Sequence, residues 1–154
     1  MAYSPWTAGM QITAGKLNSM VGIWQAYTPT WTSDGGTTTL GNGELIGRYQ
    51  QVGDQVTVVM RLGWGSTTSS TGTAWHFSLP TPVGPGGSIL YPLEAWIYDS
   101  SVPTRYAANG YVNATAQDVQ AIIVHGSGSI IDQSDPMIWA TGDRLNIWGT
   151  YESS

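Results

Sequence analysis

The stretch LGNGELIGRYQQVGDQVTVVMRLGW, residues 40–64, contains the clearest strand pattern in the chain. Gly53 and Asp54 form a tight-turn signal in its middle. Beyond that turn alternate positions share a face, with Val56, Val58, Met60, Leu62 and Trp64 on one side and Thr57, Val59 and Arg61 on the other. The pattern predicts two antiparallel strands, the second of which turns its apolar face toward a core.

The same alternation continues from Tyr27 to the end of the chain. A first strand is expected at residues 27–32, where Pro29 favours an edge or a strand start. Later candidates include a short one at residues 136–140. About nine strand candidates, separated by Gly, Pro, Asn and Ser turns, predict an all-β fold. We expect an antiparallel β-sandwich or jelly-roll-like domain over residues 27–154.

Residues 1–26 differ from the rest and are expected to form an N-terminal arm. Within the arm, ITAGKLNSMVGIW (residues 12–24) is the best helical candidate. Thr13 can cap this helix, and Leu17, Met20 and Val21 fall on one of its faces. A helix of about two turns is marginal alone, so the arm is expected to hold at most one short helix that docks on something else.

The composition excludes several classes of protein. Charged residues make up 10% of the chain, against roughly 25% in an average soluble domain. Eight Trp and eight Tyr argue against disorder, and no apolar run reaches the length of a membrane helix. Only five Lys and Arg with a net charge of −5 argue against a nucleic-acid partner. The chain has no cysteine, and its N-terminus lacks the pattern of a secretory signal.

Residues 27–80 resemble a module of tail-fibre and minor tail proteins from bacteriophages that infect actinobacteria. The resemblance lies in the opening YTPTW, the segment LGNGELIGRY, the turn VGDQV, a strand ending in WG, and WHFSLP after a Ser/Thr/Gly-rich tip. It implies a virion structural protein, made in the host cytoplasm and commonly a homotrimer. Such a protein is mounted on other virion proteins by its N-terminal part and exposes a β domain, which we expect to face the host surface. The resemblance identifies no ligand; the hydroxyl-rich composition and the aromatics make a host cell-surface glycan one candidate partner.

Two other functions are considered beside this one. A small protein with an arm and a knob also fits a capsid decoration or head-fibre protein that grips the shell through residues 1–26. The third and lowest-ranked alternative is a virion-associated glycan hydrolase, for which Glu94, inside a strand candidate, is the least ordinary carboxylate.

The candidate functional residues lie in two segments. The arm contributes Trp6, Leu17, Met20 and Trp24 as candidates for attachment to the virion or to a neighbouring subunit. The polar segment at residues 65–74 is expected to be a mobile hairpin tip. Its candidate host-facing residues are Ser66, Thr67, Thr68, Ser69, Ser70 and Thr71.

No catalytic, cofactor-binding or metal-binding residues are expected. His76 and His125 show no zinc-ligand spacing, and Asp132 with Asp135 lacks the other oxygens of a calcium loop. The remaining aromatics in strand candidates are expected mostly to pack in the core; they are Trp64, Trp75, Trp96, Trp139 and Trp148.

Overall fold

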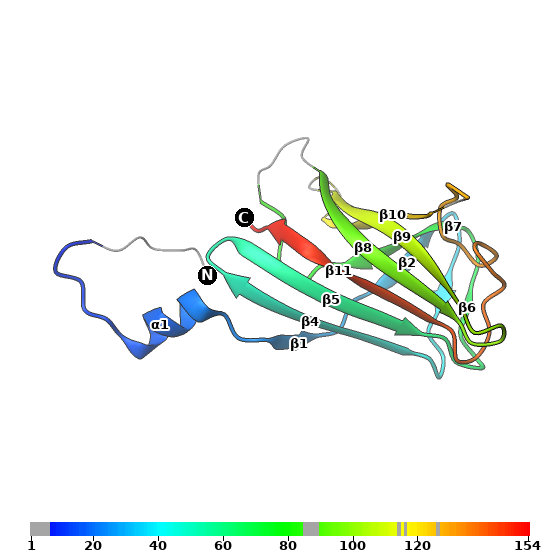
Figure 1. Cartoon of the computed structure of the whole chain (residues 1–154), viewed down its shortest axis with the longest axis horizontal. Helices are drawn as coiled ribbons and strands as arrows, with labels where there is room; N and C mark the ends of the chain where they lie inside the picture. Colours follow the sequence, from blue (N-terminus) through cyan, green and yellow to red (C-terminus); the bar gives the residue numbers. More distant parts are fainter. Residues whose placement is uncertain (1–6, 85–89, 114, 116, 126) are drawn as a thin grey trace.

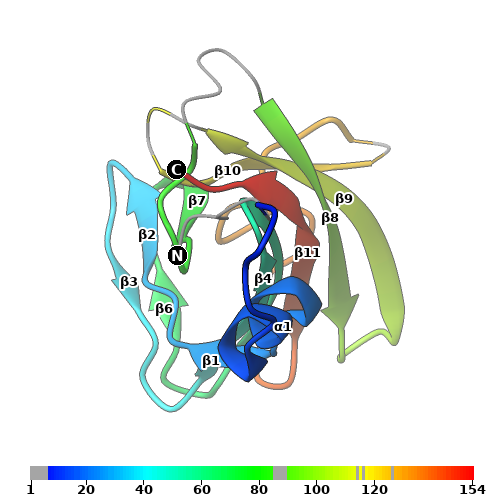
Figure 2. The same ribbon diagram turned by 90° about the vertical axis from the view of Figure 1, so that its left-hand side faces the viewer.

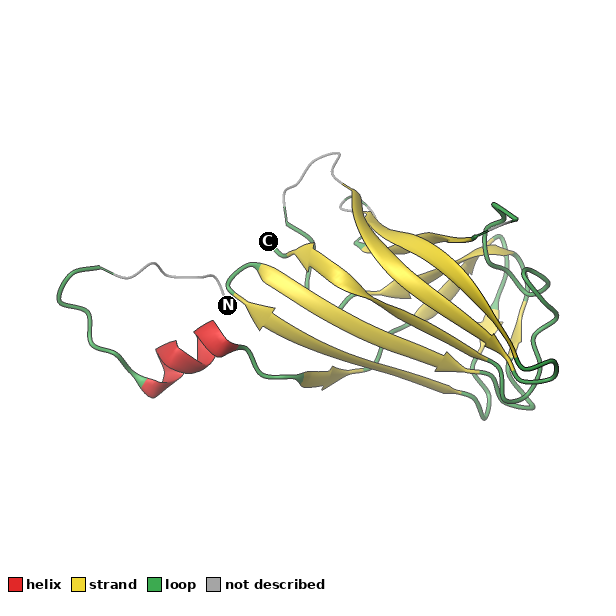
Figure 3. Ribbon diagram, in the orientation of Figure 1, coloured by secondary structure: helices red, strands yellow, loops and turns green. Residues whose placement is uncertain are grey.

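The computed structural model describes residues 7–84, 90–113, 115, 117–125 and 127–154. It contains one short helix near the N-terminus, and the rest of its regular structure is strand (Figure 3). The elements are α1 (Ala14–Val21), β1 (Gln25–Tyr27), β2 (Trp31–Asp34), β3 (Thr38–Thr39), β4 (Glu44–Val52), β5 (Gln55–Gly63), β6 (Ser69–Ser70), β7 (Thr73–Ser78), β8 (Leu90–Asp99), β9 (Thr104–Asn113), β10 (Asp118–Val124) and β11 (Arg144–Glu152).

Nine of these strands form one antiparallel sheet with the order β1-β4-β5-β11-β8-β9-β10-β7-β2. The sheet curls into a half-barrel, so that β2 and β7 lie across from β4 and β11 (Figures 1 and 2). Strands β3 and β6 form a separate two-stranded sheet. The expected antiparallel all-β fold is therefore present, but one curled sheet replaces the two packed sheets of a sandwich.

The hairpin at the centre of the opening stretch has the predicted form. Strands β4 and β5 pair over their full length, from Glu44 opposite Gly63 to Val52 opposite Gln55. Gly53 in the turn has φ +60°, a conformation that glycine adopts without steric cost. The inward side chains of β5, from Val56 to Leu62, are buried as the alternation predicted.

Two strand predictions were wrong in detail. The segment at residues 27–32 is split between two strands, since β1 ends at Tyr27 and β2 begins at Trp31. Residues 136–140 form no strand. They belong to the connection that leads into β11, where Trp139 donates its indole N–H to the backbone oxygen of Asp132 at 2.9 Å.

The short link at residues 28–30 accounts for the curl. Strands β1 and β2 are the two edges of the nine-stranded sheet, yet only three residues connect them. A fully extended chain spans about 3.5 Å per residue, so the two edges lie within about 14 Å of each other at this point. A sheet of nine strands meets that condition only by bending round on itself.

Four tryptophans fill one end of the space inside the curl. Trp75 on β7 lies 5.0 Å from Trp31, 5.8 Å from Trp64 and 4.9 Å from Trp139, measured between ring centroids. Trp75 is completely buried and each of the other three is less than 10% exposed. Because these residues come from β2, β7 and the segments after β5 and before β11, the cluster joins the two sides of the curled sheet.

We predict that Trp75→Ala lowers the free energy of unfolding by about 3–5 kcal/mol, because it leaves a cavity between three rings. Urea unfolding measures the change. Trp96→Ala removes the same side chain from a position that is 46% exposed and is the control, with an expected loss of about 1 kcal/mol or less. Equal losses in the two variants would contradict a core built on the tryptophan cluster.

Candidate functional site

The arm has its predicted helix, and its attachment candidates are exposed. Thr13 caps α1 by accepting a hydrogen bond from the Lys16 backbone N–H at 3.2 Å. Leu17, Met20 and Trp24 are each 40–46% exposed. Further exposed apolar side chains on the arm are Ile12, Val21 and Ile23. Trp6 lies outside the described residues. An apolar surface of this kind on a projecting segment is typical of a contact with another protein.

The arm is joined to the domain along β4, which lies next to the edge strand β1. Gln25–Tyr27 pair with Tyr49–Gly47, so pairing begins just before the expected boundary at residue 26. The Gln50 side-chain amide donates to the backbone oxygens of Val21 and Gly22. Tyr27 lies directly over Gly47, where an added Cβ would come within 2.3 Å of the Tyr27 ring. The orientation of the arm thus depends on a glycine at position 47.

The polar tip is a well-connected loop. We call residues 65–72 the tip loop. Asn42 holds it by accepting hydrogen bonds from the Thr67 backbone N–H and hydroxyl, both at 2.9 Å, and by donating to the Ser66 hydroxyl at 3.0 Å. Strand β6 pairs with β3 inside the same loop. These bonds do not fit the mobile tip that the composition predicted.

The tip loop has an inward and an outward side. Thr68 and Ser70 are buried, and the Thr68 hydroxyl donates to the backbone oxygen of Leu40 at 2.5 Å. The exposed members of the predicted host-facing set are therefore Ser66, Thr67, Ser69 and Thr71. The tip loop and the arm lie at opposite ends of the long axis (Figure 1). This arrangement lets one end hold the protein while the other remains open.

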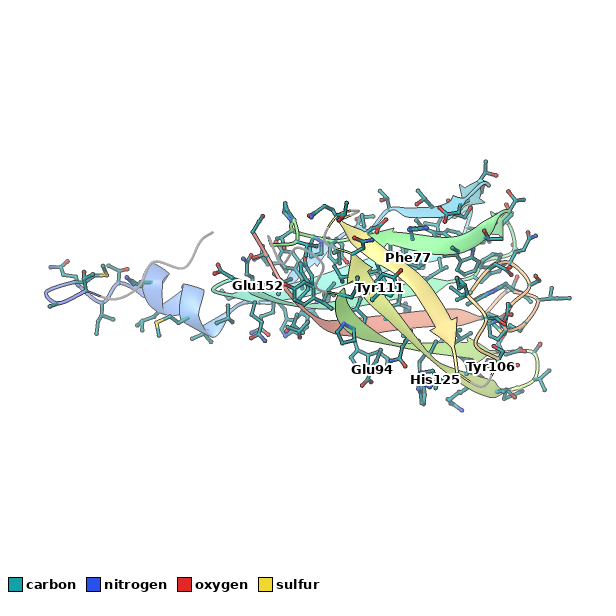
Figure 4. All side chains as sticks on the ribbon, turned by 90° about the horizontal axis from the view of Figure 1, so that it is seen from above. Phe77, Glu94, Tyr106, Tyr111, His125 and Glu152 are labelled. Carbon is teal, nitrogen blue, oxygen red and sulfur yellow. The ribbon has the colours of Figure 1, made fainter. Side chains whose placement is uncertain are left out.

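Among the described residues, no second carboxylate lies directly opposite Glu94 in the sheet. Glu94 is exposed and projects outward from the sheet (Figure 4), and its direct neighbours across the sheet are Trp148 and Asn109. Buried Asp143 serves the backbone instead, because it accepts hydrogen bonds from the N–H groups of Ser100 and Ala140.

Other acidic residues also have structural roles. Asp132 accepts bonds from the backbone N–H groups of Ser134 and Asp135. Hydrogen bonds from Ser101, first among several, hold the pKa of Asp99 below its ordinary value. These carboxylates are turn-stabilising acceptors, as the residues in such turns usually are.

The two histidines lie in different surroundings. His76 on β7 is 3.1 Å from an Asp34 oxygen through Nε2 and 3.2 Å from an Asp118 oxygen through Nδ1. It therefore links β2, β7 and β10. His125 is exposed and contacts Asn109. Within the described part of the chain, no group of three or more His, Cys, Asp or Glu side chains is arranged to hold a metal ion.

The sheet also presents a surface that the sequence prediction missed. We call the side of β4, β5, β11, β8 and β9 that points away from the core the outer face. Trp96 and Trp148 lie on it, 46% and 36% exposed, although core packing was expected for most strand tryptophans. The alternation around them contained the signal, because Leu93, Ala95 and Ile97 on β8 and Leu145 and Ile147 on β11 are the buried set.

Comparison with known proteins finds one informative similarity. The chain is 28% identical over 136 residues to the "Mu-like prophage FluMu defective tail fiber protein" of Haemophilus influenzae. The matched part covers 88% of this chain and 21% of that relative, so the chain spans about a fifth of the relative's length. The similarity agrees with the tail-fibre resemblance of residues 27–80. A Haemophilus prophage does not support the actinobacterial host lineage.

No protein-family model matches the chain, and no solved structure matches it. Among the described residues, no helix has the length and apolar character needed to cross a membrane.

We predict that Gly47→Ala loosens the junction between the arm and the domain. The new methyl group would overlap the Tyr27 ring, so β1 must shift, at an expected cost of about 1–3 kcal/mol. Hydrogen exchange at the backbone amides of residues 25–27 should become at least several-fold faster. Gly63→Ala on the neighbouring strand, where the nearest atom would be 3.7 Å from the added Cβ, should leave these amides unchanged. Unaltered exchange in Gly47→Ala would mean that close approach at this position is not required.

We predict that Asn42→Ala releases the tip loop, because it removes three side-chain hydrogen bonds to Ser66 and Thr67. At about 1 kcal/mol per bond, the amide of Thr67 should exchange at least tenfold faster. Ser69→Ala changes an exposed side chain in the same loop and is the control. Equal exchange rates in Asn42→Ala and the parent protein would show that Asn42 does not hold the loop.

Proposed function

We propose that this chain is a bacteriophage virion protein of the tail-fibre type, which is mounted through its arm and presents its curled β domain to the host surface. The observation that carries the proposal is the similarity of 88% of the chain to a prophage tail fiber protein. That relative is named as a tail fiber protein, which favours a binding role over an enzymatic one. The proposal covers the tail-fibre class and names no host, since the two sequence likenesses point to different bacteria.

The geometry supports different roles for the two ends of the molecule. The exposed apolar residues of the arm, including Leu17, Met20 and Trp24, suit a contact with another virion protein. The opposite end carries the tip loop, whose conformation is fixed by hydrogen bonds rather than by a partner. A rigid tip loses little conformational freedom on binding, which favours recognition of a surface ligand.

We further propose that the chain assembles as a homotrimer with other virion proteins around it. The exposed apolar residues of the arm supply contact area at the end where three copies would meet. A capsid decoration protein would use the same arm to grip the shell. The similarity to a tail fiber protein favours the tail, and position on the particle separates the two functions.

The decisive measurement is the location of the protein on intact virions of the phage that encodes it. An antibody raised against the folded chain, coupled to gold, should label the tail end in small numbers. Label spread over the head in large numbers would replace the proposal with capsid decoration, and absence from purified particles would overturn both. Light scattering of the purified chain at micromolar concentration should give three times 16.5 kDa, and a monomer mass would contradict the trimer.

A further inference from the structure

The positive charge of the chain is concentrated on the outer face. All four arginines project from it, on four different strands: Arg48 on β4, Arg61 on β5, Arg105 on β9 and Arg144 on β11. The strand positions of this face also carry the three glutamates Glu44, Glu94 and Glu152, whereas the aspartates lie in turns and at strand ends. Four arginines therefore face three glutamates on this side of a protein of net charge −5. Arg144 and Arg105 lie on either side of Tyr98, and this pair of positive side chains attracts anions.

Two exposed tryptophan rings lie among these arginines. Trp148 is flanked across the sheet by Val59 and Glu94. Trp96 lies in the next row of outward side chains, beside Asn146. Because Trp148 and Trp96 are diagonal neighbours on adjacent strands, their side chains are about 7–8 Å apart or closer. Exposed indole rings on an open sheet suit stacking against the apolar faces of sugar rings.

The arginines near these rings are placed to bind carboxylates. The Arg105 guanidinium lies 5.8 Å from the Trp96 ring centroid and 5.2 Å from that of Tyr98. Stacking of this kind fixes the orientation of the guanidinium and leaves the N–H donors at the edge of the guanidinium available for hydrogen bonds. Arg144 is opposite Tyr98 in the sheet register, and no ion-pair partner for it occurs in the described ranges. Arg61, by contrast, is paired with Glu44.

The mixture of polar and apolar groups favours a sugar chain over a second copy of the protein. Each of the three rows that contain Trp148, Trp96 and Tyr98 has charged or amide side chains, such as Arg48 with Asn109, Arg61 with Asn146, and Arg144 with Arg105. The centre of a stable protein interface is instead depleted of charged residues. Sugar rings combine apolar faces with hydrogen-bonding edges, which matches isolated indoles surrounded by donors and acceptors.

We propose that the outer face binds a carboxylated sugar chain. Its rings stack on Trp148 and Trp96, and carboxylates at the ring edges accept hydrogen bonds from Arg144 and Arg105. An arginine fork binds a carboxylate through two parallel N–H donors, so one uronic acid unit can engage an indole and a guanidinium together. This inference rests on the proposed function, because it supplies a ligand for host attachment, and it adds the outer face to the tip loop as a binding surface.

The test is a titration of the full chain with oligogalacturonate, monitored by tryptophan fluorescence and isothermal calorimetry. Binding should weaken with rising salt and should be lost for the methyl-esterified oligomer, which has the same rings without the charges. Trp148→Ala and Arg144→Gln should each weaken binding roughly tenfold, the effect of losing a stacked ring or a charge-assisted hydrogen bond of about 1.5 kcal/mol.

Matched controls separate the site from general charge and folding effects. Lys16→Gln removes the one positive side chain that lies off the outer face, and Ile138→Ala changes a side chain that is 85% exposed elsewhere. Both should bind like the parent protein. Circular dichroism in the near ultraviolet confirms that the outer-face variants keep the core tryptophans in place.

Four outcomes would overturn the inference. The first is no binding of oligogalacturonate, and the second is equal binding of the charged and the methyl-esterified oligomer. The third is a loss of affinity in Lys16→Gln as large as that in the outer-face variants. The fourth is a parent protein that is oligomeric and that Trp148→Ala dissociates, which would make the outer face an interface between copies. Tighter binding of a polyol phosphate polymer, which contains no sugar acids, than of oligogalacturonate would show that the ligand is not a carboxylated sugar chain. If oligogalacturonate does not bind, the proposal that the chain is a virion protein still stands. If gold labelling finds no protein on particles, the proposed function is rejected even if oligogalacturonate binds.

Discussion

The three-residue link between β1 and β2 is the constraint on which the rest of the structure depends. These strands are the two edges of a nine-stranded sheet, and residues 28–30 keep them close together. Hydrogen bonds between Thr30 and Ser78 hold the link against β7. Because the sheet must bend to meet this condition, its concave side becomes a single enclosed core. The cluster around Trp75 then fills the space at one end of the curl.

The same bend separates the side chains of the sheet into an inward set, which forms the core, and an outward set, which faces away from it. Inward positions carry Val, Ile, Leu, Met and Trp, whose burial stabilises the fold. Outward positions on β4, β5, β11, β8 and β9 are free of that requirement, and there the chain places its four arginines together with Trp96 and Trp148. The sheet face thereby orders side chains from distant segments of the chain into rows, as the proposed binding of a sugar chain requires.

The arm adds a second surface with a different character. Its helix is too short to be stable alone, and it contacts the domain mainly through Gln50 on β4. The Trp24 ring also lies 5.7 Å from the Arg48 guanidinium on β4, but the apolar side chains of the arm remain largely exposed. An apolar, weakly docked arm at one end and polar surfaces beyond it are the features expected of a module that is mounted on a larger assembly.

The sequence by itself determined the local structure of this protein. It predicted the hairpin of β4 and β5, the buried face of β5 and the helix capped by Thr13, because a turn glycine, alternating apolar residues and a capping hydroxyl act over a few neighbouring residues. Only the tertiary structure decided that β11 lies between β5 and β8, that one sheet curls where a sandwich was expected, and that the tip loop is held by Asn42. It also brought four arginines from separate strands onto one face. These features depend on pairing between segments far apart in the chain, which no local pattern of residues specifies.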